Sequence, residues 1–124
     1  ERQAVLSDER KASVPKNKPI TDIYASVVKS KNGSEYCQVV FTVKDEFFPK
    51  KMPLMFGHPT AHKMAVRKWK KITTKWGSPS QPWMAAELIN SGAFDTISEI
   101  IVQKQGKYEN VVGIKTKQNE DIDL

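Results

Sequence analysis

The amino-acid sequence predicts a mainly β (α+β) domain, and three features of the chain support this class. Residues 20–29 and 35–44 are two strand-like runs on either side of an Asn-Gly turn. One strongly amphipathic helix is expected in the middle of the chain, at residues 60–76. Two further strand-like runs follow, at about residues 94–103 and 107–115.

The first two runs are expected to form an antiparallel hairpin. Apolar residues from Cys37 to Val43 alternate with the residues of the opposite face, which include Tyr36. The turn at 31–34 contains Asn-Gly, a strong hairpin signal. A short apolar run at 52–56 follows, and its internal proline predicts an edge strand.

The central helix is expected to begin at Thr60, a capping residue, and to end before Gly77. Its apolar stripe includes Trp69 and Trp76, which we therefore expect in the core. A second, shorter helix is expected at about 82–90.

This order of elements predicts a five-stranded OB-fold barrel, with a helix between strands 3 and 4 and a short helical insertion. Another kind of α+β sandwich fits the same order. The expected organisation is a flexible N-terminal arm at 1–18, an OB-fold domain at 19–117 and an acidic disordered tail at 118–124.

Charge is unevenly distributed along the 124 residues, which carry 20 Lys and Arg, 14 Asp and Glu, and a formal net charge of +6. Residues 44–75 contain nine basic and two acidic side chains, whereas residues 119–124 contain three carboxylates and no basic group. A basic body with an acidic tail indicates a polyanionic partner.

Several function classes are disfavoured by the sequence. No run is apolar enough for a membrane span, residues 1–18 are too polar for a signal peptide, and the single Cys37 indicates a reducing, cytoplasmic setting. His58 and His62 have no neighbouring ligands that would complete a metal site. There is no phosphate-loop or nucleophile-elbow pattern and no central carboxylate cluster. We therefore expect a protein without enzymatic activity, metal or cofactor.

In an OB barrel, the first–second and fourth–fifth strand connections flank the binding cleft. Both are basic here, and each has a tyrosine beside it on which a base could stack. The 44–51 segment combines basic and aromatic residues like a mobile flap, with one phenylalanine expected to fill the core. The expected nucleic-acid-binding residues are Lys29, Lys31, Tyr36, Lys44, Phe47, Lys50, Lys51, Lys104, Lys107 and Tyr108.

Two further charged segments have both a functional and an ordinary interpretation. The central helix carries a basic face that either tracks a phosphate backbone or is simply its solvated side; it comprises Lys63, Arg67, Lys70, Lys71 and Lys75. The tail carboxylates either compete with nucleic acid and help to dock partners or only aid solubility; they belong to Glu120, Asp121 and Asp123.

Residues 20–36, the helix at 61–76 and residues 106–112 together resemble the small single-stranded-DNA-binding proteins of bacteriophages, particularly phages of lactic acid bacteria. The resemblance implies an OB fold, self-association (often as dimers), and protection of single strands during phage replication or recombination. The tail departs from bacterial relatives, because it ends in Asp-Ile-Asp-Leu rather than in an acidic run closed by Pro-Phe. This departure puts docking into the usual host partner in doubt.

The sequence thus predicts a protein that binds single-stranded DNA with little sequence preference. Two alternatives stay open. One is an RNA-binding OB module, and the other is a phage protein-interaction module that inhibits a host enzyme.

Overall fold

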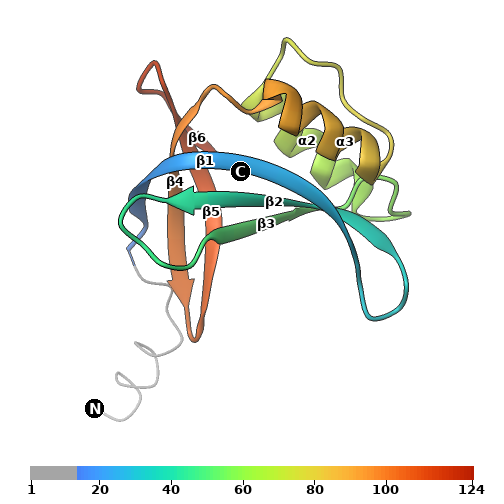
Figure 1. Ribbon diagram of the computed structural model, residues 1–124, viewed down its shortest axis with the longest axis horizontal. Coiled ribbons are helices and arrows are strands. Elements are labelled where there is room, and N and C mark those ends of the chain that lie inside the picture. The colour runs from blue at the N-terminus through green and yellow to red at the C-terminus, as the bar shows by residue number, and fades with distance from the viewer. Residues whose placement is uncertain (1–13) are drawn as a thin grey trace.

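The computed structural model describes residues 14–124, which form a six-stranded antiparallel sheet and a helical segment inserted between its third and fourth strands (Figure 1). This confirms the mainly β class. In the described part of the chain, no helix is long and apolar enough to cross a membrane. The elements are β1 (Lys16–Lys29), β2 (Glu35–Val43), β3 (Lys50–Leu54), α2 (His62–Ile72), α3 (Pro82–Leu88), η1 (Ile89–Ala93), β4 (Ile97–Gln105), β5 (Tyr108–Thr116) and β6 (Asp121–Asp123).

β1 takes part in two portions of the sheet. Its first residues, Lys16–Pro19, pair with residues 99–102 of β4. The remainder, Ile20–Lys29, pairs with β2, after an irregularity between Ile20 and Asp22. The β1-β2-β3 portion and the β4-β5-β6 portion therefore run in different directions and meet at β1 (Figure 1).

The strand order is β3-β2-β1-β4-β5-β6, which is an open sheet with β3 and β6 at its edges. β3 is thus an edge strand, as its Pro53 predicts. β3 and β5 are not paired strands in this sheet. Side chains link them, because the ammonium group of Lys50 contacts the carboxylate of Glu109.

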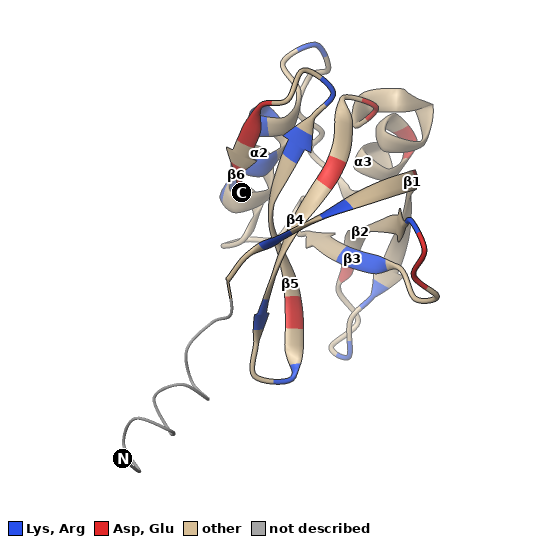
Figure 2. Ribbon diagram, turned by 90° about the vertical axis from the view of Figure 1, so that its left-hand side faces the viewer, with Lys and Arg blue, Asp and Glu red and all other residues tan. Residues whose placement is uncertain are grey.

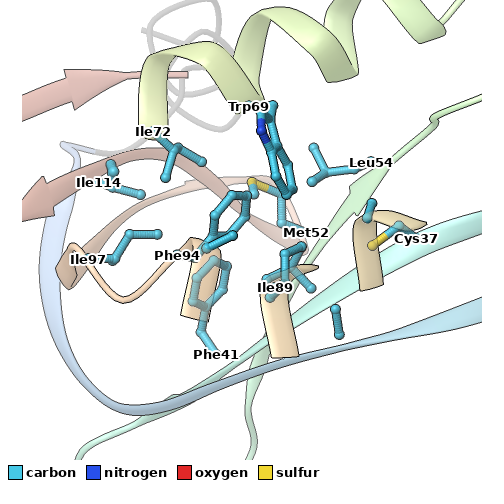
Figure 3. Packing of buried hydrophobic residues seen from close by; sticks show 14 of the residues in the cluster. Cys37, Phe41, Met52, Leu54, Trp69, Ile72, Ile89, Phe94, Ile97 and Ile114 are labelled. Carbon is cyan, nitrogen blue, oxygen red and sulfur yellow. The ribbon is translucent and has the colours of Figure 1, made fainter. Parts of the chain in front are cut away.

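The core lies between the sheet and the helical segment, and Trp69 of α2 is at its centre (Figure 3). The Trp69 ring packs against Phe94 and Phe56, with ring centroids 5.0 and 5.8 Å away. Its Nε1–H donates a hydrogen bond of 3.1 Å to the carbonyl of Trp76, so the indole is both buried and hydrogen-bonded. The expected core position of Trp69 is confirmed, and Trp76 is half-buried beside it.

The central helix is shorter than the sequence suggests, and Thr60 is not its capping residue. Two imidazoles accept the backbone hydrogen bonds at its start. Nδ1 of His58 accepts from the N–H groups of Thr60 and Ala61, at 3.1 and 3.0 Å, and Nδ1 of His62 accepts from Gly57 at 2.9 Å. Both histidines therefore have a structural part in the turn that leads into α2.

One side chain of the inserted segment forms hydrogen bonds with the backbone of β1. Asn90 Oδ1 accepts a hydrogen bond of 2.8 Å from the N–H of Ala25, and its Nδ2 donates one of 2.9 Å to the Ala25 carbonyl. Asn90 thereby satisfies both polar groups of a β1 residue that lies beyond the β4 pairing.

The two ends of the expected domain differ from the sequence-based boundaries. Residues 1–13 of the expected arm lie outside the described residues, and residues 16–18 belong to β1. The expected disorder of the tail is wrong for Asp121–Asp123, which form β6 against β5. Gly113 permits this pairing, since an added Cβ would lie 2.8 Å from the Ile122 carbonyl oxygen. Ile122 and Leu124 then pack against the core.

Candidate nucleic-acid interface

Two basic hairpin tips project from the same side of the molecule (Figures 1 and 2). The β1–β2 turn at 30–34 and the two-residue β4–β5 turn at 106–107 each contain a glycine with positive φ, 88° at Gly33 and 62° at Gly106. The predicted lysines of both hairpins are exposed there, and they are Lys29, Lys31, Lys104 and Lys107. The two basic turns, which are far apart in sequence, thus point to the same side of the molecule.

A tyrosine lies beside each of these turns. Tyr108 directly follows the β4–β5 turn and is 74% exposed, whereas Tyr36 is half-buried. Tyr24 is also exposed and was not among the expected site residues. It shares a row across the sheet with Val40 and Lys51, because antiparallel partners lie on one face. The alternation of β1, which places Tyr24 on its outer face, was the signal that could have identified it.

The segment between β2 and β3 presents two aromatic rings to solvent. Phe47 and Phe48 are 91% and 72% exposed and form an edge-to-face pair with centroids 4.9 Å apart. The expectation that one of them fills the core is wrong. The reason is that phenylalanines of other elements already occupy it, including the fully buried Phe41 of β2.

The lysines of this segment differ in their surroundings. Lys44 and Lys51 are exposed, as expected of phosphate-binding groups. Lys50 is instead enclosed by two carboxylates, that of Glu109 in direct contact and that of Glu46 at 3.6 Å. The hydrogen bond to Glu109 raises the pKa of Lys50, and the same bond lowers the pKa of Glu109.

Lys18, which the sequence did not single out, completes this ion-pair group. Its ammonium nitrogen lies 2.6 Å from a Glu46 oxygen and 3.9 Å from a Glu109 oxygen. The group therefore joins β1, the 44–49 segment, β3 and β5. We assign Lys50 to holding these elements together rather than to contact with a ligand.

In the view of Figure 1, α2 lies above the sheet, whereas both hairpin tips are at the bottom. All five of its predicted residues are exposed, and they are Lys63, Arg67, Lys70, Lys71 and Lys75. β6 runs beside this helix, and Lys71 Nζ donates a hydrogen bond of 3.0 Å to the Asp123 carbonyl (Figure 2). The tail carboxylates, from Glu120, Asp121 and Asp123, are thus exposed near α2 rather than near the hairpin tips.

The chain has a single cysteine. Cys37 is fully buried in β2, and burial raises the pKa of its thiol to about 12, which suppresses the reactive thiolate at neutral pH. Among residues 14–124, no group of three or more His, Cys, Asp or Glu side chains is placed to hold a metal ion. The chemistry that this surface does offer is cation–anion contact and aromatic stacking.

Comparison with known proteins does not identify a family or a function for this chain. No family model matches the sequence, and neither the comparison with curated proteins nor that with solved structures found a significant match. The arrangement of the side chains described above is therefore the basis for assigning a function.

Proposed function

We propose that this protein binds single-stranded DNA with little sequence preference, on the surface that extends from the two hairpin tips to the exposed aromatic segment at 44–49. One observation carries the proposal. Lysines from two sequence-distant hairpins lie on the same side of the molecule, with the exposed ring of Tyr108 beside one of them.

The chemistry of this surface suits a single strand better than a duplex. Lysines neutralise phosphates of either form, but aromatic rings need base faces on which to stack. Those faces are free in a single strand and covered in a duplex. Stacking also tolerates every base, which accounts for the low sequence preference.

The order of the elements supports an OB-type barrel as the scaffold. β1 pairs with β2 and with β4, α2 lies between β3 and β4, and the Lys50–Glu109 contact joins β3 to β5. In an OB fold, β3 and β5 are the strands that meet to complete a partly open barrel, and the loops after β1 and β4 flank the ligand. β6 is then an addition to the five-stranded pattern.

The resemblance to phage proteins supports the biological setting that we propose. In that setting, the protein covers single strands during phage DNA replication or recombination in the host cytoplasm, as a dimer or other homo-oligomer. A replication or recombination partner would meet the exposed carboxylates of β6.

A binding titration tests the proposal directly. Fluorescence anisotropy would compare labelled single-stranded DNA, duplex DNA and single-stranded RNA of matched sequence at two salt concentrations. We expect the tightest binding to single-stranded DNA, with log affinity falling by about 0.7 per phosphate contact for each log unit of salt. Tighter binding to RNA would favour the RNA-binding alternative. No binding of any oligonucleotide at physiological salt would favour the protein-interaction alternative.

A further inference from the structure

A pocket of about 380 Å³ opens on the inner side of the β1–β2 hairpin, away from the outer face that carries Tyr24. Three segments form it, namely the hairpin, the loop after β3 and the start of α3, and all three lie at the right-hand end of the molecule in Figure 1. Its lining residues include Val27, Glu35, His58, Gln81 and Trp83.

The pocket offers one ring face and several hydrogen-bonding groups. Trp83, in the first turn of α3, is 59% exposed, which is unusual for so large an apolar side chain. Glu35 supplies a carboxylate and Gln81 an amide. His58 uses Nδ1 as an acceptor for two backbone N–H groups, so Nε2 carries the proton of the neutral ring and is a donor.

The pocket is continuous with the proposed DNA-binding surface. Val27 lines it, and Lys29 follows two residues later on the same face of β1. Lys29 is also directly paired across the hairpin with Glu35, another lining residue. A phosphate bound at Lys29 would therefore place the adjoining nucleotide at the opening of the pocket.

We propose that this pocket binds one nucleobase of the single strand, stacked on Trp83, and that Glu35 gives it a preference for bases with an exocyclic amino group. The inference rests on the proposed function. A carboxylate accepts hydrogen bonds but donates none, so it pairs with the amino groups of cytosine, adenine or guanine. Thymine has no such group and is the base expected to fit least well.

The neighbouring charges favour a nucleotide over a protein ligand. Lys29 and Lys31 are exposed on the same hairpin, and cations at the opening attract the phosphates on either side of the bound base. A pocket of this volume also lies in the range typical of small-ligand sites, roughly 300–1,000 Å³, and is ample for a single base.

The test compares the affinities of oligo-dC and oligo-dT, each of roughly 12 nucleotides, a length within the site sizes of OB folds. The intact chain should bind oligo-dC more tightly than oligo-dT. Trp83→Ala should weaken both by roughly 5- to 100-fold if a base stacks there, and Trp83→Phe should retain most of the affinity. Met64→Ala is the matched control, because Met64 is 58% exposed on α2 and lies outside both surfaces.

Glu35→Gln tests the base preference separately. It should reduce the oligo-dC to oligo-dT affinity ratio towards one, even though loss of a carboxylate raises affinity for both. Asp22→Asn, which removes an exposed carboxylate from the middle of β1, controls for that charge effect and should leave the ratio unchanged.

The outcomes separate this inference from the proposed function. If the intact protein binds neither oligomer, the proposed function fails and the pocket assignment fails with it. If the intact protein binds but Trp83→Ala and Glu35→Gln behave like the control variants, only the nucleobase pocket is overturned, and the pocket is then left to a protein ligand.

Discussion

The two basic surfaces of this protein differ in what accompanies their positive charge. The surface that we propose for DNA binding combines lysines with exposed rings, those of Tyr108, Phe47 and Phe48. α2 has a denser row of cations, but its Trp69 is buried and the acidic β6 lies beside it. The number of cations alone would therefore select α2 rather than the surface that we propose for DNA binding.

The two surfaces also differ in the contacts that their charged groups make. At α2, Lys71 already donates to the β6 backbone, and the carboxylates of Asp121 and Asp123 reduce the local potential. On the surface that we propose for DNA binding, the carboxylates of Glu46 and Glu109 are paired with Lys18 and Lys50. The carboxylates near the two surfaces thus have different partners.

We expect the largest change in DNA affinity from charge reversal at the hairpin tips, with charge reversal on α2 as the comparison. Lys29→Glu with Lys107→Glu should lower single-stranded DNA affinity by roughly tenfold or more and the salt dependence by about 1.4 in log–log slope, the sum for two phosphates. Arg67→Glu with Lys71→Glu changes net charge equally and should leave affinity close to that of the unmodified chain. Equal losses in both double variants would show that the DNA path continues onto α2.

The next effect isolates stacking at the hairpin end. Tyr108→Ala should cost about 1–3 kcal/mol of binding free energy, because an exposed ring beside a basic turn is available to a base. Tyr108→Phe keeps the ring and should bind nearly as tightly. Anisotropy titrations at one salt concentration measure both, and equal affinity of the alanine variant would remove Tyr108 from the interface.

A smaller effect is expected on the free energy of unfolding, through the hydrogen bonds between Asn90 and β1. Asn90→Ala should lower the free energy of unfolding by about 1–2 kcal/mol, because the two polar groups of Ala25 lose their partner. Urea denaturation measures this change. Asn90→Asp, which keeps an oxygen acceptor for the Ala25 N–H, should be intermediate. Alanine and unmodified proteins of equal stability would contradict the supporting role.

The smallest effect is the pH dependence of the ion-pair group. The lowered pKa of Glu109 adds stability above its ordinary value of 4.5, and that stability is lost as the pH falls through the folded-state pKa. The raised pKa of Lys50 adds stability below 10.5 that is lost as the pH rises through its folded-state value.

Glu109→Gln should therefore flatten the acid side of a plot of thermal midpoint against pH. Glu87→Gln, at an exposed position of α3, serves as the matched variant and should keep the original profile. If the two variants gave the same profile, the Lys50–Glu109 contact would have no measurable part in stability.

Local patterns made part of the fold predictable from the sequence. The alternation from Cys37 to Val43 and the Asn-Gly turn identified the first hairpin, and the spacing of apolar residues placed Trp69 in the core. These signals depend on neighbours within a few residues. The lysines of the two turns could be selected for the same reason, since turn positions follow from strand positions.

Features that depend on distant neighbours could not be predicted in this way. The tail forms β6 because Gly113 leaves room for the Ile122 carbonyl, and composition alone suggests disorder there. Whether Phe47 is exposed depends on which other rings fill the core. The exposure of Trp83 likewise depends on how α3 packs on the sheet, and an apolar residue in a short helix gives no sign of it.

The shared strand β1 has a consequence for the order in which the chain can fold. Its second half pairs with β2, a neighbour in sequence, and this hairpin can form early. Its first residues, Lys16–Pro19, have their strand partners at residues 99–102, so this pairing forms only after most of the chain has left the ribosome. The free edge of the β1–β2 hairpin can pair with other chains. β4 covers only the first residues of β1, so further along that edge the hydrogen bonds from Asn90 to Ala25 take the place of a neighbouring strand.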